Sequence, residues 1–402
     1  FSTKSRPTAE LPPLEFKLPP DLPTAEALRT ASELHVQAEA YVLISPSMLE
    51  IVRLGATQVV LHFPILAAIP RAALTEGEHK LRALELAKYY SPVIFQQTND
   101  ARKDFITKFN YDGNWRGDDN ADNIDKFPLK AYVYYSVVES KAHYFLGYYF
   151  FHPDDYTKMT GPACGFFNRV GRHENDLEGI QLVVEKDGTP YGSLLAMETI
   201  AHIWFHQLEN SDRVKDKREV PEVLEDIDGH IEVETNRDGV HPKVYVECLG
   251  HGVWGYGHNG KELKPGTKHV VYRVGDQAEE PEGPNDHDVR YELIDVFDPQ
   301  EGLWNHREKF ADALPDRPYT KPDTFWDGFA YTQQWGSAFF GDDGSTARPP
   351  WGWQAKGTRR GDWVMAPAFA FSRHLAIPGL SGENLTYVSN AFLKPGGGNP
   401  GI

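Results

Sequence analysis

The sequence has little of what marks nucleic-acid-binding or membrane-spanning proteins. Its 402 residues carry a formal net charge of −17, and no run of lysine and arginine is longer than two residues. This charge repels nucleic-acid phosphates and anionic membranes, so we expect no nucleic-acid partner, whereas bound cations fit the charge well. The most apolar stretch, residues 59–70, is too short to cross a bilayer and contains two prolines, so no transmembrane segment is expected.

Cysteine is also scarce, since Cys164 and Cys248 are the only two. They fit either one disulfide that closes a long loop or two buried thiols. Neither has an electropositive sequence neighbourhood, and the chain contains no G-x-S-x-G motif and no glycine-rich phosphate loop. Thiol catalysis, a serine nucleophile and nucleotide chemistry are therefore disfavoured.

Several features favour a secreted, monomeric protein. The sequence begins at Phe1 without a methionine, as a processed mature form or a trimmed one would, and Asn384-Leu385-Thr386 is a glycosylation sequon. Aromatic residues make up 12% of the chain and apolar residues 40%, which is typical of a globular protein with a substantial core.

The first part of the chain, residues 1–90, is expected to form an extended arm and helices packed outside the main domain. Residues 1–23 are rich in proline, and apolar residues recur at helical spacing over 24–44, 47–73 and 77–89. The remainder, residues 91–402, is expected to be the main domain. Its last part, 330–402, is aromatic and rich in glycine, and is expected to form irregular loops with up to two strands.

Short segments rich in β-branched and aromatic residues follow from about residue 93, separated by turn signals. They predict a mainly β protein, an antiparallel β-sandwich with long loops. The segments are AYVYYSVV (131–138), HYFLGYYFFH (143–152), GIQLVVEKDG (179–188), KVYVEC (243–248), HVVYRVG (269–275) and RYELIDVF (290–297).

A polar decapeptide, GRHENDLEGI at 171–180, stands at the mouth of one of these strands. In an extended strand Asp176 and Glu178 share a face, and His173 can fold back towards them. Two carboxylates and an imidazole form a plausible site for a divalent cation, or for acid–base work by groups that push each other's pKa apart. A polar turn with solvated charges fits the same residues.

Two other strands also end in ligand-type side chains. YYFFHPDDY, residues 148–156, ends in His152, Asp154 and Asp155, and KVYVECLGHG, residues 243–252, ends in Gly250-His251-Gly252. Asp is disfavoured within strands, and histidine flanked by glycine is typical of close approach. These segments together predict one site at one end of the sheet.

Two further segments have competing interpretations. His202 and His206 have the spacing of a helical zinc pair but lack the glutamate of a zinc protease, so a half-buried strand face is favoured, from which His202 can still reach the site of His251. The loop 110–125 holds five aspartates but lacks the EF-hand pattern, so a solvated polar loop is favoured over a calcium loop.

The combination of segments resembles a known family. HENDLEG at 173–179 is similar to the histidine–acid heptapeptide of the necrosis- and ethylene-inducing peptide-like proteins, whose core reads His-Arg-His-Asp-Trp-Glu. FFHPDD and ECLGHG resemble the flanking strands of that family. YSPVIF at 90–95 resembles a Tyr-x-Pro segment that follows a helix in the wider superfamily that includes the vacuolar-protein-sorting-62-like proteins. The resemblance covers residues 85–300. The family's tryptophan is Leu177 here, and His173 matches a motif histidine only through a one-residue shift.

The resemblance implies a β-sandwich that holds a divalent cation at one end. The residues carried over as metal ligands are Asp155, Asp176, Glu178 and His173. Ca²⁺ or Mg²⁺ is expected because most of these ligands are oxygens, and Zn²⁺ becomes the better choice if two or more of His173, His202 and His251 converge.

Two functions follow from this site. The first is a secreted, cation-dependent protein that binds or acts on a cell-surface glycan or lipid headgroup. The second is a metal-dependent hydrolase or lyase of a phosphoester or polysaccharide, in which His173, His202 or His251 acts as acid or base. Because Cys164 and Cys248 lie on the segments that flank the site, a disulfide between them is predicted.

Overall fold

The structure is a computed structural model that describes residues 53–54, 57–58, 76–99, 102–156, 173–201, 204–217, 227–310, 350, 362–380 and 387–393. The chain divides into two compact units, Phe1–Arg71 and Ala72–Ile402. In the first unit, β1 (Arg53–Leu54) pairs antiparallel with β2 (Thr57–Gln58). The helix expected over 24–44 lies outside the described residues. Within 47–73 the four described residues form two short paired strands rather than part of a helix.

The second unit is mainly β, as the sequence predicts, and the helix expected over 77–89 is confirmed as α2. The described elements are α2 (Glu76–Tyr89), β3 (Val93–Gln97), α3 (Asn120–Asn123), β4 (Tyr132–Ser140), β5 (His143–Asp155), β6 (His173–Glu185), β7 (Ser193–Ala201), β8 (Trp204–Glu209), β9 (Lys215–Asp216), β10 (Gly229–His230), β11 (Val233–Thr235), β12 (Val240–Val246), β13 (Val253–Gly255), β14 (His269–Val274), β15 (Asp286–Asp295), α4 (Leu303–His306), η4 (Arg307–Lys309), α6 (Asp362–Met365), α7 (Pro367–His374), β16 (Leu375–Ala376) and β17 (Tyr387–Ser389).

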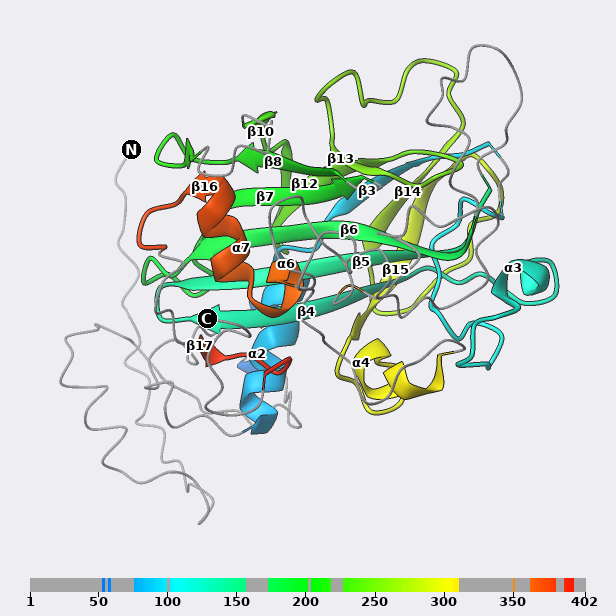
Figure 1. Ribbon diagram of the computed structural model, residues 1–402, viewed down its shortest axis with the longest axis horizontal. Helices are drawn as coiled ribbons and strands as arrows, with labels where there is room; N and C mark the ends of the chain where they lie inside the picture. Colours follow the sequence, from blue (N-terminus) through cyan, green and yellow to red (C-terminus); the bar gives the residue numbers. More distant parts are fainter. Residues whose placement is uncertain are drawn as a thin grey trace, which may run out of the picture. The chain divides into compact units, whose positions relative to one another are not determined.

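Thirteen of the described strands form one sheet, which curls into a half-barrel (Figure 1). Its order is β10-β8-β7-β6-β5-β4-β15-β14-β3-β12-β11, with β13 beside β12 and β17 beside β4. Strands β4 to β8 are antiparallel, but four pairs are parallel: β10–β8, β15–β4, β14–β15 and β12–β3. A purely antiparallel sandwich is therefore not confirmed. Residue patterns indicate where strands lie, whereas the direction of each pair depends on contacts between distant segments.

Strand β5 is buried along its whole length, because the sheet is covered on both faces. Tyr149 and Phe151 join a core cluster with residues of α6 and α7, which lie over one face in Figure 1. Tyr148 and Phe150 join the cluster on the other face, which includes Leu86 of α2. This two-sided burial explains the continuous apolar run HYFLGYYFFH. It also places the polar end of β5 out of water.

The thiols and the acidic loop bear on two sequence predictions. Cys248 is a free, half-buried thiol, so the predicted disulfide is not confirmed, and Cys164 lies outside the described residues.

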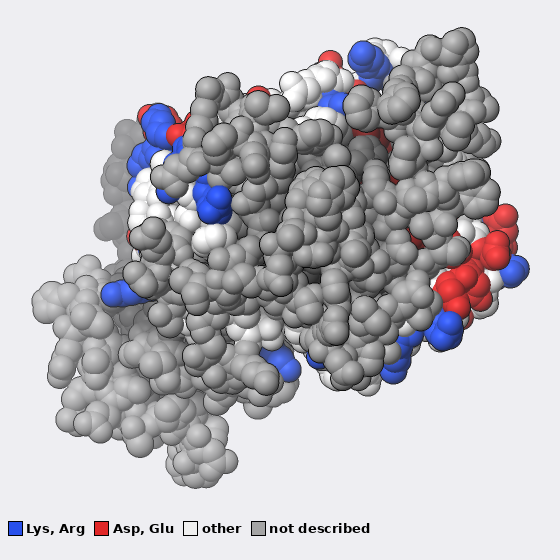
Figure 2. All heavy atoms as spheres, in the orientation of Figure 1, with Lys and Arg blue, Asp and Glu red and all other residues white. Residues whose placement is uncertain are grey.

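Acidic side chains gather on the surface around α3 (Figure 2), where Asp118 is paired with Arg116 at 2.8 Å. Asp112 accepts hydrogen bonds from the backbone NH of Asn114 and from the side chain of Asn123. These local partners fit the solvated polar loop.

None of the helices within the described ranges is both long and apolar enough to cross a membrane.

Candidate metal centre

The end of β5, the start of β6 and the turn after β12 meet inside the protein. His152 of β5 stands directly opposite Asp176 of β6 in the strand register, and His251 comes from the turn between β12 and β13. All three side chains are fully buried. Among the residues that the structure describes, they are the one group of three or more His, Cys, Asp or Glu whose ligand atoms all lie within 4.8 Å of one another.

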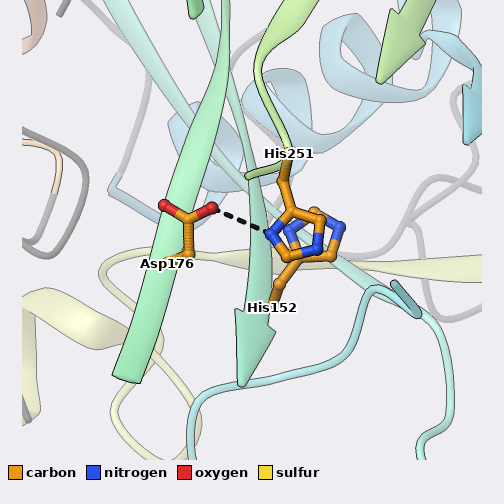
Figure 3. Close-up of side chains that lie close together, drawn as sticks. All are labelled: His152, Asp176 and His251. Carbon is orange, nitrogen blue, oxygen red and sulfur yellow. Dashed lines mark hydrogen bonds and ion pairs between the residues drawn. The ribbon is translucent and has the colours of Figure 1, made fainter. Parts of the chain in front are cut away.

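The geometry of the three side chains is shown in Figure 3. The Nδ1 atom of His251 lies 2.9 Å from Oδ2 of Asp176. The rings of His152 and His251 are stacked, with centroids 3.8 Å apart and planes 4° from parallel. A nitrogen of each ring lies on the side that faces Asp176. The cluster therefore presents two imidazole nitrogens and a carboxylate on the same side of the stacked rings.

The backbone around the cluster adopts uncommon conformations. Four non-glycine residues in the described part of the chain have a positive φ, and three belong to the segments of this site: Asn175 (60°), Leu249 (77°) and His251 (52°). Such conformations are unfavourable for residues with a side chain and persist where the surroundings impose them. The segments of the site are thus held in place by their surroundings.

Asp104 holds the turn that carries His251. Its Oδ1 atom accepts a hydrogen bond from the backbone NH of Leu249 at 2.9 Å. Its Oδ2 atom accepts hydrogen bonds from the backbone NH of Asn99 and from the hydroxyl of Tyr156, both at 2.7 Å. The Nε2 atom of His251 lies 3.4 Å from Oδ1 of Asp104, which is ion-pair range. His251 thus lies between two buried aspartates.

The two aspartates determine the charge of His251. Burial alone lowers the pKa of His251, but hydrogen bonding and charge from Asp104 and Asp176 outweigh it and raise the pKa to about 10. Without a bound ion, His251 is an imidazolium whose Nδ1 donates to Asp176. A cation bound by Nδ1 displaces that proton, so binding releases it.

His152 is the neutral partner. Burial, and then the charge of His251, hold the pKa of His152 well below its usual value. Its Nε2 atom lies 3.0 Å from Oε1 of Gln96. Its Nδ1 atom is buried and has no hydrogen-bond partner in the described part of the chain. A buried polar atom without a partner costs about 1–3 kcal/mol, and a bound ion would remove that cost.

The donor set fits a divalent cation. Two ligand atoms bound at about 2.0–2.1 Å to a tetrahedral ion lie about 3.3–3.4 Å apart. Nδ1 of His251 and Oδ2 of Asp176 lie 2.9 Å apart, so they must separate slightly to share an ion. The nitrogen lone pairs lie in the ring planes, and the two planes are nearly parallel. Coordination of one ion by both rings therefore requires one ring to tilt away from the stack.

Two other residues predicted from sequence, Glu178 and Asp155, are not part of the three-residue group. Glu178 is fully buried on β6, and its Oε2 atom accepts a hydrogen bond from the backbone NH of Val253 at 2.9 Å. Asp155 is buried at the end of β5, where its backbone pairs with His173, and it is not part of the three-residue group. The side chain of His173 and all of His202 lie outside the described residues.

Sequence reasoning missed two neighbours of the cluster, Gln96 and Asp104. Gln96 lies within the apolar strand β3, and Asp104 lies in a loop with no motif. No spacing rule connects either residue with His152 or His251, so only the fold brings them together. His152 itself was recognisable as a ligand-type side chain at a strand end, but its position opposite Asp176 depends on the register of β5 and β6.

Comparisons with known proteins find similar structures only at low sequence identity and low TM-score. No protein-family model matches the chain, and no curated protein matches its sequence. Among solved structures it is similar to NLPPya in complex with glucosamine, at 12% identity and a TM-score of 0.28 over 64% of this chain and 91% of that chain. It is also similar to a structure described as a toxin fold for microbial attack and plant defense, at 12% identity and a TM-score of 0.24 over 55% and 75%.

A third similar structure is necrosis and ethylene inducing protein 2 from the causal agent of cocoa's witches broom disease. Its identity is 12% and its TM-score is 0.24, over 42% of this chain and 66% of that chain. All three TM-scores are below 0.5, so the candidate site rests on this chain's own residues. The solved structures that are similar to this chain thus include necrosis- and ethylene-inducing proteins, at low TM-scores.

Proposed function

We propose that this chain is a secreted protein that binds one divalent cation at His152, Asp176 and His251 and uses it to hold a cell-surface glycan or lipid headgroup. The observation that carries the proposal is the buried Nδ1 atom of His152, which lacks a partner in the described part of the chain and faces the His251–Asp176 pair. Asp104 and Asp176 place two negative charges on either side of His251, and a bound cation would help to neutralise them.

The glycan or headgroup ligand is proposed from the resemblance of the HENDLEG, FFHPDD and ECLGHG segments to the necrosis-inducing family. Amino sugars are the ligands named for two similar structures, so they are reasonable first probes. Asp155, Glu178 and His173 remain proposed contributors to the same end of the sheet.

The alternative is a metal-dependent hydrolase or lyase. A histidine between two carboxylates favours it, because such a group can move a proton in a reaction. Full burial of the three side chains restricts contact with the ion for a substrate and for a bound headgroup alike, so it does not separate the two functions. The resemblance of the surrounding segments to the necrosis-inducing family makes binding the preferred function.

The test uses the full chain, stripped with a chelator and reloaded with Mg²⁺, Ca²⁺ or Zn²⁺. Binding to a glycan array and to liposomes, vesicle leakage, and turnover of phosphodiesters, phospholipids and polysaccharides are measured for each form. Ion-dependent binding without turnover is the expected result. Ion-dependent turnover of any of these substrates would establish the enzyme instead.

A matched control lies on the same strand. His143 is also fully buried on β5, with Nε2 against the carbonyl of Pro378 and Nδ1 without a hydrogen-bond partner among the described residues, but it is not part of the three-residue group. His152→Gln should abolish the ion-dependent binding, whereas His143→Gln should preserve it. Binding and turnover that are both insensitive to the chelator and to His152→Gln would contradict the proposal, and the cluster would then be a buried ion-pair network.

A further inference from the structure

The amide of Gln96 has one permitted orientation. Its Nε2 atom donates hydrogen bonds to the carbonyls of Gln97, at 3.0 Å, and Glu247, at 2.9 Å. A flipped amide would turn its oxygen against these two carbonyl oxygens, which cannot donate. The Oε1 atom therefore faces Nε2 of His152 at 3.0 Å and acts as an acceptor.

This orientation sets the tautomer of His152. Because Oε1 of Gln96 can only accept, Nε2 of His152 must carry the hydrogen. In a neutral imidazole the other nitrogen, Nδ1, then holds the free lone pair. This is the nitrogen that is buried without a hydrogen-bond partner among the described residues.

Asp104 acts on His251 from the other side of the ring by its charge, since Nε2 of His251 has an ion-pair contact with Asp104 but no hydrogen-bond partner among the described residues. Its carboxylate lies 3.4 Å from Nε2 of His251, whereas Asp176 lies 2.9 Å from Nδ1. Three other donors hold the Asp104 carboxylate in place: the backbone NH groups of Leu249 and Asn99 and the hydroxyl of Tyr156. A fixed negative charge beside Nε2 keeps the hydrogen there and leaves Nδ1 for a cation shared with Asp176.

The resulting donor set is two imidazole nitrogens and one carboxylate. Ca²⁺ takes six to eight oxygen ligands, and Mg²⁺ also prefers oxygen. Zinc and similar first-row ions accept imidazole and carboxylate together, and two histidines with one carboxylate is a recurrent set for them. The ligands predicted from the sequence indicated Ca²⁺ or Mg²⁺ because most of them are carboxylates.

We propose that Gln96 and Asp104 are positioning residues that present both Nδ1 atoms, and that the site therefore selects a zinc-type transition ion over Ca²⁺ and Mg²⁺. This inference rests on the proposed cation site. It goes further by assigning the class of ion and the two residues that determine it.

The first arm of the test measures ion affinity by calorimetry on the ion-free full chain, with Zn²⁺, Co²⁺, Mg²⁺ and Ca²⁺ as probes. Zn²⁺ and Co²⁺ are expected to bind at least about 100-fold more tightly than Mg²⁺ or Ca²⁺. Gln96→Met, which keeps the size but removes the acceptor, should weaken Zn²⁺ binding about 10–100-fold, the usual effect of losing such a partner. Gln207→Met is the control, since Gln207 is an equally buried glutamine on β8 whose amide donates to the carbonyl of Phe205.

The second arm measures the histidine tautomers and the ligand environment of the bound ion. In ¹⁵N-histidine-labelled ion-free protein, His152 should be the Nε2–H tautomer, and Gln96→Met should shift it towards the other tautomer. The absorption spectrum of bound Co²⁺ should change in Gln96→Met and in Asp104→Asn, but not in Gln207→Met. Asp104→Asn also loosens the turn at Leu249, so Gln96→Met decides the outcome if Asp104→Asn does not fold.

The results distinguish two failures. If the wild-type chain binds none of the four ions, the cation site itself is wrong. If it binds an ion but prefers Mg²⁺ or Ca²⁺, or if Gln96→Met leaves both the affinity and the tautomer unchanged, the cation site stands and the inference about Gln96 and Asp104 is overturned.

Discussion

Asp176→Asn separates the role of this carboxylate in the fold from its role in ion binding. Placement at a strand mouth suggested from the sequence that the change would spare the fold. The structure instead buries Asp176 completely and pairs it with His251 at 2.9 Å. Asparagine keeps an acceptor for Nδ1 of His251 and Asp104 remains on the other side, so only the charge is lost.

The expected cost follows from that geometry. A hydrogen bond to a charged group contributes about 1.5–3 kcal/mol, and complete loss of one partner of a buried ion pair costs about 3–5 kcal/mol. We therefore expect Asp176→Asn to lower the free energy of unfolding by about 1.5–3 kcal/mol in chelator, and Asp176→Ala by about 3–5 kcal/mol. Urea denaturation followed by circular dichroism measures both values.

A second buried carboxylate–imidazole pair provides the control. Glu198 is fully buried and lies 2.7 Å from both Nδ1 of His374 and Nε1 of Trp363. Glu198→Gln should destabilise the ion-free protein to a similar extent. With Zn²⁺ at 100 times its Kd, the wild-type chain and Glu198→Gln should both gain about 2.7 kcal/mol, and Asp176→Asn should gain nothing comparable. A loss below about 0.5 kcal/mol for Asp176→Asn, with the full gain on adding Zn²⁺, would refute this account of the site.

Three further predictions concern regions outside the cluster. Gly179→Ala should destabilise the protein by about 1–3 kcal/mol in thermal or urea unfolding, because its Cβ would lie 2.1 Å from the carbonyl oxygen of Tyr148, whereas Gly283→Ala, in open space, should stay within about 0.5 kcal/mol. Burial, and then nearby acidic charge, raise the pKa of Cys248 to about 11, so its alkylation at pH 7.4 should be about 100-fold slower than that of an ordinary thiol; an ordinary rate would contradict this. Burial also lowers the pKa of His143, so the unfolded chain binds a proton at this residue more readily than the folded chain. The free energy of unfolding should therefore fall as the pH drops below about 6.5. His143→Gln should reduce the slope of unfolding free energy against pH by up to about 1.4 kcal/mol per pH unit in urea unfolding.

Much of the β architecture is readable from local patterns. The apolar run HYFLGYYFFH predicts a strand, and β5 is a strand that is buried along its whole length. The helical spacing over 77–89 likewise predicts α2. These patterns report burial of one chain segment, which its own residues determine. The neighbour of each strand is a different question. β3 lies parallel to β12, about 150 residues further along the chain, and no local pattern encodes that pairing.

The candidate site was predictable only in part for the same reason. Asp176 and His251 belong to segments whose polar residues interrupt apolar strands, and that interruption is a local signal. Asp104 and Gln96 have no such signal, because each acquires its role only through a hydrogen bond or ion pair to a histidine far away in the sequence. The expected ion changes for the same reason. The sequence groups Asp176 with other acids, which favours Ca²⁺ or Mg²⁺, whereas the fold places it beside two histidines from separate segments, which favours a zinc-type ion.

The most direct test of the central claim is elemental analysis of the full chain after it has been loaded with Zn²⁺ and dialysed. The account predicts about one ion per chain in the wild type and in His143→Gln, and none in the double variant His152→Gln/His251→Gln, with both variants checked for folding by circular dichroism. An ion-free wild-type chain, or a double variant that retains its ion, would contradict the claim that His152, Asp176 and His251 form a cation site.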